Sequence, residues 1–367
     1  MRKLLLALVT LGALGLALGA WLAFAPNTPD FEGTRSVRIP PGTSFDATVE
    51  LMEYEGLVDS RTSLTTFGTL TGWRRQVKPG HYAFEAGASN WDLLDKIRKG
   101  LQDPIRVTIP PGTRPEVLAA VLRRDLGTDS AAVRQALRDP ALAADLGTDT
   151  LHLFGHMRAN SFDIFWTTDA ETALRRIHAW YDRFWTDERE AQAEALGLTP
   201  DEVITLASIV EWEARVPEER PRIAGVYLNR LLGRTNAGRM RLQADPTVQY
   251  ALMQADGGPM RRLLRDDYRF AHPYNTYTND GLPPGPVTNP SESSIDAVLN
   301  AEDHDFLYFV AEPGGTGRHR FSRTLRDHNA SADAWSAWLS EQVRIRQQRE
   351  DSLRQDSLRR ARESVTL

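Results

Sequence analysis

Residues 199–214 read TPDEVITLASIVEWEA and predict a well-bounded helix around which the second half of the chain is organised. Thr199 suits the N-cap, Pro200 the first helical position and Glu202 the third, which together form a strong helix start. Pro217 bounds the other end. The sequence therefore fixes where this helix begins and which residues lie in its last turn.

A helical wheel places one of the two glutamates of this helix on its apolar side. At about 100° per residue, the apolar arc comprises Val203, Leu206, Ala207, Val210 and Ala214. Glu213 falls inside the arc, Glu211 lies on its other flank, and Trp212 points to the opposite, nominally polar face. Burial raises the pKa of a carboxyl group, as a general acid at neutral pH requires. The alternative to a catalytic role is that Glu213 forms a structural ion pair with Arg215, Arg220, Arg222 or Arg230.

Polar loops follow the helix, at 242–247, 273–277 and 281–286. They combine amide and carboxylate side chains with tyrosine rings, which suits the binding of sugar hydroxyls and pyranose faces. Plain turn chemistry explains the Pro-Pro-Gly segment equally well. Further on, 306–311, a glycine-rich turn and a return through His319 and Phe321 predict a β-hairpin.

The N-terminus predicts a membrane segment. Arg2 and Lys3 precede an uncharged stretch, Leu4 to Ala25, long enough to cross a bilayer. The positive residues favour a cytoplasmic N-terminus with the rest of the chain outside. A cleaved signal peptide ending at Ala23-Phe24-Ala25 is the alternative. The glycines at 12, 15 and 19 argue against a buried core helix.

A repeated unit follows the membrane segment. Ile-Pro-Pro-Gly-Thr occurs at 39–43 and again at 109–113, each time after a strand-like segment and before a helical one. The first unit continues through a second helix to a strand at 80–84. This strand–helix–helix–strand order (βααβ) resembles a LysM-like module, a glycan-binding fold; here the module could instead serve only as a spacer.

Composition excludes several classes of function. The 367 residues include 44 Lys and Arg, 49 Asp and Glu, and no cysteine. An acidic balance argues against nucleic-acid binding, and the lack of cysteine excludes disulfides, a cysteine nucleophile and thiolate metal sites. The histidines are not expected to form a metal site, and no serine nucleophile elbow occurs. We therefore expect no metal and no cofactor.

Six ordered motifs resemble the YceG-like family, the MltG-type endolytic murein transglycosylases. They lie at 207–213, 226–231, 242–247, 274–277, 281–285 and 327–329. The resemblance implies an α+β protein with a single N-terminal transmembrane helix, a LysM-like module and a lysozyme-like catalytic domain that includes the hairpin. The expected division is a cytoplasmic end (1–3), transmembrane helix (4–25), LysM-like module (34–105), second strand–turn–helix unit with helical connector (106–195), catalytic domain (196–342) and charged tail (343–367).

The resemblance also implies an activity. The family's catalytic acid is the second glutamate of Glu-x-Glu, which is Glu213 here. The expected reaction is cleavage of the MurNAc–GlcNAc β-1,4 bond within peptidoglycan strands, leaving 1,6-anhydro-MurNAc ends and terminating strand elongation. The candidate substrate-binding residues are Gln243, Asp245, Asn275, Tyr277, Glu211 and Asn229. The expected location is the inner membrane with the body in the periplasm, and the expected partners are glycan strands, penicillin-binding proteins and other cell-wall synthesis enzymes.

Two other functions remain open. A hydrolytic muramidase would pair Glu213 with Glu211 or Asp245, because hydrolytic glycosidases use two carboxylates. It would leave a reducing end instead of an anhydro end. A non-catalytic glycan-binding scaffold would tolerate loss of Glu213.

Overall fold

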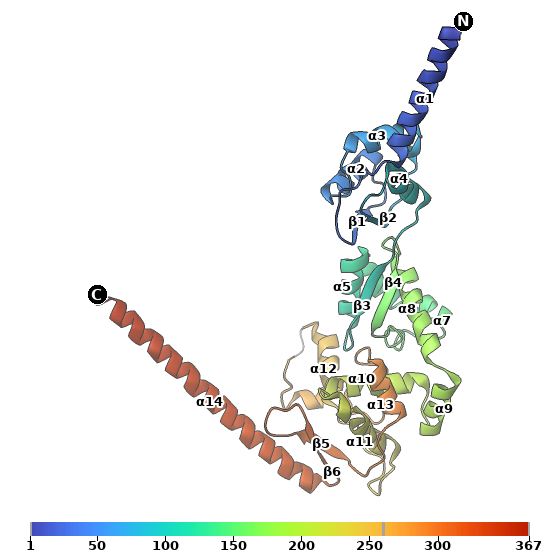
Figure 1. Ribbon diagram of the computed structural model, residues 1–367. Coiled ribbons are helices and arrows are strands. Elements are labelled where there is room, and N and C mark those ends of the chain that lie inside the picture. Colours follow the sequence, from blue (N-terminus) through green and yellow to red (C-terminus); the bar gives the residue numbers. More distant parts are fainter. Residues whose placement is uncertain (1, 259–260, 366–367) are drawn as a thin grey trace. The chain divides into compact units, whose positions relative to one another are not determined.

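The computed structural model describes residues 2–258 and 261–365, with side chains described as far as Arg354. The chain divides into two compact units, each with its own core (Figure 1). Unit 1 comprises Met1–Ile109, Pro115–Arg138 and Ser161–Ile177, and unit 2 comprises Pro110–Arg114, Asp139–Asn160 and His178–Leu367. Helices dominate, and the described strands form three two-stranded sheets, so the predicted α+β class is confirmed.

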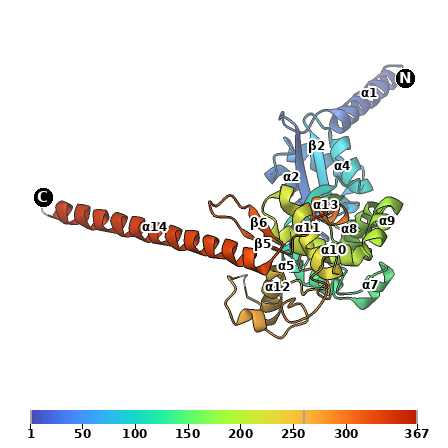
Figure 2. The ribbon, with the colours of Figure 1, turned by 90° about the horizontal axis from the view of Figure 1, so that it is seen from below.

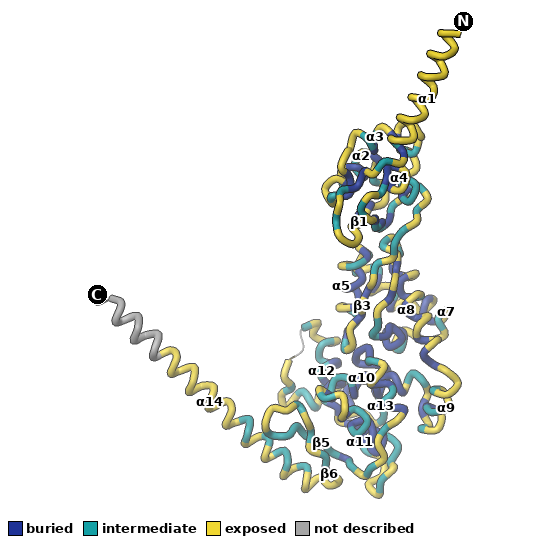
Figure 3. The backbone as a smooth tube through the Cα atoms, in the orientation of Figure 1, coloured by how far each residue is buried: buried dark blue, intermediate teal, exposed yellow. Residues whose placement is uncertain are grey.

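Unit 1 begins with an apolar helix and a small mixed module. Helix α1 (Arg2–Phe24) is exposed along most of its length (Figure 3). The module then runs β1 (Thr34–Ile39), α2 (Phe45–Tyr54), α3 (Arg61–Leu70), η1 (Trp73–Arg75), β2 (Gly80–Glu85) and α4 (Asn90–Lys99). Strands β1 and β2 pair antiparallel, from Thr34 opposite Glu85 to Ile39 opposite Gly80.

The predicted βααβ order is present, but the module contains one helix more. Helix α4 starts at a capping box between Ser89 and Asp92 and buries Leu93, Leu94 and Ile97 in the same core as the two strands. The module is therefore a βααβα unit. The LysM-like assignment stays a prediction.

The repeated Ile-Pro-Pro-Gly-Thr motif forms the same turn twice. Gly42 and Gly112 have φ of 80° and 70°, a conformation that glycine adopts without strain. The Thr43 hydroxyl donates to the Pro40 carbonyl at 2.8 Å, and Thr113 donates to Pro110 at 2.6 Å. Each turn joins a strand to a helix, β1 to α2 and then β3 (Ile105–Ile109) to α5 (Pro115–Leu126).

The second repeat continues as the first does, with helices and a partner strand. These elements are α6 (Ser130–Ala136), α7 (Pro140–Asp145), β4 (Asn160–Ile164), which pairs with β3, and α8 (Ala170–Phe184). The segment expected to be a helical connector therefore contributes a strand, β4, which pairs with β3. Whether 34–105 folds as a separate domain stays a prediction.

Unit 2 is built around α10 (Pro200–Glu213). The Thr199 hydroxyl accepts from the Glu202 amide and the Glu202 carboxylate accepts from the Thr199 amide, so the predicted capping box is confirmed. Helices α11 (Arg220–Leu232), α12 (Asp245–Asp256) and α13 (Glu292–Leu299) pack against α10; α10, α11 and α13 lie side by side in Figure 1 and Figure 2. The remaining helices are α9 (Asp187–Leu196), η2 (Pro217–Glu219) and η3 (Asp267–Arg269).

Helix α10 is enclosed on all sides, which differs from the amphipathic wheel. Every residue from Val203 to Val210 is buried, including Thr205 and Ser208. Trp212, expected on a polar face, packs against the core of unit 2. The Ser208 hydroxyl donates to the Thr205 carbonyl and accepts from the Val287 amide, which is how a polar residue is accommodated in the interior.

The predicted hairpin is confirmed and leads into a long terminal helix. Strands β5 (Tyr308–Ala311) and β6 (His319–Ser322) pair antiparallel. Helix α14 (Leu325–Val365) follows and packs its first turns against the hairpin. The charged segment after Val343 continues this helix, and the side chains described there are exposed.

Candidate active site

Glu213 is the last residue of α10, where two effects disfavour its negative charge. The side chain is half-buried, and burial raises the pKa of the carboxyl group to about 7, with the negative charge of Asp245 adding to the rise. The C-terminal end of a helix is also the negative end of its dipole. The expected desolvated carboxyl at position 213 is therefore what the structure shows.

Two neighbours oppose this rise. The Tyr227 hydroxyl on α11 donates to Glu213 Oε1 at 3.0 Å, and the positive charge of Arg230 is close enough to lower the carboxyl pKa. Burial raises the pKa of Tyr227 well above its ordinary value, so the phenol keeps its proton. The carboxyl is thus held in one orientation while its pKa stays near neutrality.

The Glu213 carboxyl faces a cavity of about 500 Å³ within unit 2. Its walls come from α10, α11, the start of α12 and the loop before it, η3 and the segment after it, the hairpin and the start of α14. The lining residues are Glu213, Tyr227, Arg230, Gln243, Asp245, Tyr268, Tyr277, Tyr308, Phe309, Val310, Ala311, His319, Leu325 and His328. Tyrosine rings and hydroxyls beside charged and amide groups suit a polar ligand with flat apolar faces, such as a sugar chain.

Asp245, the first residue of α12, is the second carboxylate in the cavity. It accepts a hydrogen bond from the Tyr277 hydroxyl at 2.7 Å and one from the Tyr268 hydroxyl at 3.3 Å. Burial, followed by the charge of Asp245, raises the pKa of Tyr268 to about 12 and that of Tyr277 further still. Both phenols therefore remain donors and hold Asp245 in place.

Gln243 lies in the cavity wall with a strained backbone. Its φ of 50° is the only positive value for a non-glycine residue in the part of the chain that the structure describes. The Gln243 backbone N–H donates to the Thr276 carbonyl at 3.2 Å. The carbonyl of the preceding residue, Leu242, accepts a hydrogen bond from the Arg230 side chain at 2.5 Å. Such strain persists where surrounding contacts determine it, and it clusters at functional sites.

Three other predicted site residues lie outside the cavity lining. The Asn275 amide group donates to the carbonyls of Tyr268 and Phe270, and its oxygen accepts from the Tyr277 amide. Asn229 donates to the carbonyls of His304 and Phe306. These two residues shape the loop that carries Tyr277 and anchor the segment before the hairpin, so no substrate contact follows from their geometry.

Glu211 is also engaged in structural contacts. One carboxylate oxygen accepts from Arg220 at 3.0 Å, and the other accepts from the Ser291 amide, the Ser291 hydroxyl and the Ser294 hydroxyl. The ion pair considered as the alternative for Glu213 is thus formed by Glu211. Glu213, two residues on, faces the cavity instead.

The sequence analysis missed several cavity residues, above all Tyr227 and His319. Tyr227 and Arg230 lie three residues apart on α11, a spacing that puts them on one face. His319 on β6 is held by Glu219, which accepts from the His319 amide at 3.1 Å and is 2.9 Å from its Nδ1. His319 and Phe321 lie two residues apart in β6 and therefore on one face of the strand, which was the available signal.

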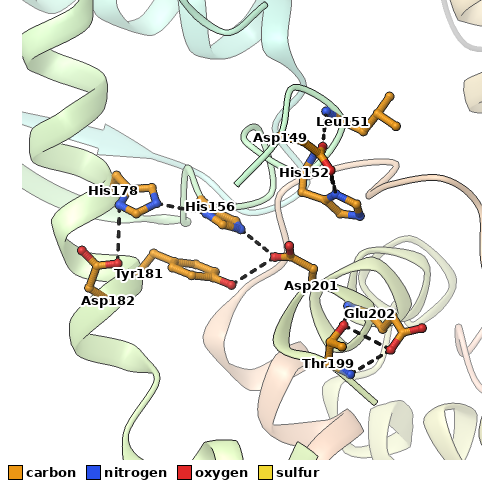
Figure 4. A network of polar contacts seen from close by, with 10 residues as sticks. All are labelled: Asp149, Leu151, His152, His156, His178, Tyr181, Asp182, Thr199, Asp201 and Glu202. Carbon is orange, nitrogen blue, oxygen red and sulfur yellow. Dashed lines mark hydrogen bonds and ion pairs between the residues drawn. The ribbon is translucent and has the colours of Figure 1, made fainter. Parts of the chain in front are cut away.

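A second polar cluster lies away from the cavity, between α8 and the start of α10 (Figure 4). His156 Nε2 is 2.7 Å from Asp201 Oδ1, and its Nδ1 is 3.0 Å from His178 Nε2. Tyr181 stacks on His156 and donates to Asp201 at 3.1 Å. Across 2–258 and 261–365, no group of three or more His, Asp or Glu residues is arranged to hold a metal ion.

The fold and the cavity define a class of α+β protein. In this class a carboxyl group with a raised pKa lies at the end of a buried helix and faces a tyrosine-rich cavity. The chain belongs to the YceG-like family, whose family model matches residues 37–334.

Named relatives agree with this assignment. A Bacillus subtilis (strain 168) protein named endolytic murein transglycosylase is 26% identical over 325 residues, covering 84% of this chain and 87% of the relative. A Streptococcus pneumoniae (strain D39) protein of the same name is 28% identical over 323 residues, covering 80% of this chain and 57% of that longer relative. A crystal structure of a yceG-like protein from Listeria monocytogenes matches 82% of this chain and 99% of its own, at 26% identity with a TM-score of 0.57.

Proposed function

We propose that this chain is an endolytic murein transglycosylase that cleaves within peptidoglycan glycan strands. The observation that carries the proposal is the Glu213 carboxyl group. It faces a tyrosine-rich cavity, and its pKa is raised to about 7. Such a group is protonated in a useful fraction of molecules at neutral pH and can then accept a proton again. The names of the relatives support the same substrate.

In this mechanism Glu213 acts as acid and then as base. Its proton passes to the glycosidic oxygen as the bond between that oxygen and C1 of MurNAc breaks. The C6 hydroxyl of the same MurNAc attacks C1 and gives its proton to the Glu213 carboxylate, so the product is a 1,6-anhydro ring and no water is consumed. Tyr227 orients the carboxyl, and Asp245 with Tyr268 and Tyr277 positions the sugar.

A hydrolytic muramidase is the second candidate, because Asp245 lines the same cavity as Glu213. In that reaction Asp245 would serve as the second carboxylate that hydrolysis requires. Mass spectrometry of the cleaved strands separates the two: anhydro ends support the transglycosylase, and reducing ends support the muramidase.

The decisive experiment is the exchange Glu213→Gln, which keeps the size of the side chain and removes its transferable proton. We expect product release to fall by about two to four orders of magnitude. Glu218→Gln is the matched control, because Glu218 is an exposed glutamate in η2, which follows α10. Retained product release in Glu213→Gln, with circular dichroism showing an intact fold in both variants, would show that Glu213 is not the catalytic acid, whereas no product from the unsubstituted chain would favour the scaffold function.

We also propose that α1 is an uncleaved membrane anchor with the body of the protein in the periplasm. Helix α1 is the one described helix that is long and apolar enough to cross a bilayer, with a mean hydropathy of 2.2. Ala23, Asn27 and Thr28 are buried in the module, so the segment around a signal-peptide cleavage site is part of a folded core. Protease added to spheroplasts should digest the body; a protected body, or a mature N-terminus at Pro26, would contradict the anchor.

A further inference from the structure

The last turn of α1 is fastened to the module by specific contacts. The Asn90 side-chain amide, at the start of α4, donates to the Leu22 carbonyl at 2.8 Å. The Asn27 side chain donates to Asn90 Oδ1 at 2.6 Å, and Pro26 pairs with Ser89 in a short β-bridge. Ala23 is buried in the module's core. The helix therefore reaches the module without a free linker, and a bilayer crossed by α1 must come close to the module.

The length of α1 sets the depth of its last turn. Its 23 residues extend about 34 Å at 1.5 Å per residue, against a hydrocarbon layer of about 30 Å. Trp21 and Phe24, which are 63% exposed, therefore fall at the boundary between hydrocarbon and headgroups. Tryptophan is enriched at this level of membrane proteins because its ring is apolar while its N–H needs a polar partner.

Aromatic side chains continue from this turn across the module. The Phe24 ring lies 5.6 Å from that of Trp91 on α4, and Trp91 lies 4.9 Å from Trp73 in η1. Trp91 is 38% exposed, although large aromatic residues at a water-facing surface are usually covered. We call Trp21, Phe24, Trp73 and Trp91 the aromatic face.

Two cations beside this face, Arg98 and Arg74, are partnered within the module, while Arg75 in η1 is exposed. Arg98 lies 4.1 Å above the Trp73 ring and pairs with Asp95, and Arg74 pairs with Asp46. Arg98 and Arg74 are therefore not free to bind anionic lipids. The chemistry that remains is that of aromatic rings and polar groups at a lipid interface, which a zwitterionic bilayer provides.

We propose that the aromatic face lies in the outer headgroup layer of the same bilayer that α1 spans. The proposal rests on the anchoring role of α1 proposed above. Contact with Phe24 puts Trp91 at headgroup depth, so the module is held against the membrane surface and does not swing freely from its anchor. The occupant of the face is lipid, and a face that stays in water beside the bilayer is the outcome that would leave it to a protein partner.

The chain contains no cysteine, so a single introduced cysteine can carry a spin label at one known place. The full chain would be placed in phosphatidylcholine nanodiscs at one chain per disc, which leaves only lipid to cover the face. Three labelled positions are compared: Leu14→Cys in α1, Trp91→Cys in the aromatic face, and Arg38→Cys as the aqueous control. Arg38 is exposed near the Ile39–Gly80 end of the β1–β2 pair, while α1 leaves the module near the Thr34–Glu85 end.

The measurement is collision with oxygen, which concentrates in lipid, relative to collision with a water-soluble nickel chelate. We expect this ratio at Trp91→Cys to lie between those at Leu14→Cys and Arg38→Cys, severalfold above the latter. A ratio equal to that at Arg38→Cys would overturn the proposal while leaving the anchor intact, and would point to a protein occupant. An aqueous ratio at Leu14→Cys would instead overturn the anchor.

A second measurement avoids loss of the tryptophan through labelling. Discs made with brominated phosphatidylcholine quench tryptophan emission by contact. Subtracting the emission of the Trp91→Phe variant from that of the unsubstituted chain gives the emission of Trp91 itself. We expect this emission to be strongly quenched in the brominated discs. Unquenched emission from Trp91 would overturn the proposal even if the cysteine variant failed to fold.

Discussion

At the residue scale, Glu213 is subject to opposing influences on its carboxyl pKa. Burial and the charge of Asp245 raise the pKa, while Tyr227 and Arg230 lower it. Each of these neighbours also lines the cavity, so the acid strength of Glu213 is set by the residues that would surround a bound sugar. Removing a single neighbour should therefore move the pH dependence of catalysis in a direction that the structure specifies.

Two substitutions should shift the pH profile of catalysis in opposite directions. Tyr227→Phe removes a hydrogen bond to the ionised carboxylate, so the pKa of Glu213 should rise and the alkaline limb of the kcat profile should move to higher pH. Asp245→Asn removes a neighbouring negative charge, so the same limb should move to lower pH. The check is kcat against pH for both variants. Shifts in the same direction would show that another group controls the limb.

Glu213 should also make the protein less stable as the pH rises. An unfolded glutamate loses its proton near pH 4.5, whereas folded Glu213 holds it until about pH 7. The folded state therefore binds more protons in this interval, and stability falls with rising pH. Glu213→Gln removes this effect, so the variant should unfold at higher urea than the unsubstituted chain at pH 8 and show no such gain at pH 4. A gain at pH 4 as large as that at pH 8 would contradict the ionisation argument.

Glu211→Gln should affect stability more than chemistry. The substitution leaves Arg220 largely buried without its charged partner, and breaking a buried ion pair costs about 3–5 kcal/mol. Urea unfolding measures the loss, and Glu218→Gln serves as the control. Activity per folded molecule should change little, since Glu211 does not line the cavity. Loss of activity in a fully stable Glu211→Gln variant would show that Glu211 takes part in substrate binding or catalysis.

At the element scale, the histidine cluster joins α8 to the start of α10 (Figure 4). Burial, and then the neighbouring His156, lower the pKa of His178. Burial raises the pKa of Asp201, but the hydrogen bond and charge of His156, the charge of His152 and the hydrogen bond from Tyr181 together lower it further, so the net pKa is lowered. Both groups resist protonation in the folded state more than in the unfolded one.

Acidification should therefore weaken this junction. A histidine whose folded pKa is lowered loses stability as the pH falls below its unfolded value, about 6.5, and Asp201 adds a further loss at lower pH. We compare variants in the Glu213→Gln background, which lacks the opposite pH effect of Glu213, and expect the urea midpoint there to fall between pH 7 and pH 5. His178→Gln cannot be protonated, so its midpoint should fall less over the same interval. An unchanged slope in His178→Gln would place the pH dependence elsewhere.

At the scale of the whole molecule, the last turn of α1 belongs to the module as much as to the membrane segment. A soluble version beginning at Ala20 keeps the Leu22 carbonyl that Asn90 binds, and one beginning at Pro29 lacks it. The shorter version should unfold at lower temperature, because an unsatisfied buried amide costs about 1–3 kcal/mol. Both should cleave soluble glycan strands equally, since the cavity lies in unit 2. Equal unfolding temperatures would show that the docked turn contributes nothing to the module.

The sequence by itself determined features that depend on neighbouring residues along the chain. The capping box at Thr199, the apolar length of α1, the two Ile-Pro-Pro-Gly-Thr turns and the hairpin all follow from local spacing and turn chemistry. The helical wheel also placed Glu213 among apolar residues, and its role as the catalytic acid stays a prediction. The YceG-like motifs then supplied the family, which the family model confirms.

Only the tertiary structure decided which polar residues share the cavity. Gln243, Asp245 and Tyr277 line it, while Asn229, Asn275 and Glu211 hold its supporting segments. Equally, α10 is covered on every side, so its wheel could not reveal that Trp212 faces the core. The reason is physical: periodicity fixes directions within one element, but contact between residues far apart in sequence depends on how α11, the loops and the hairpin pack around α10, and local spacing carries no information about that packing.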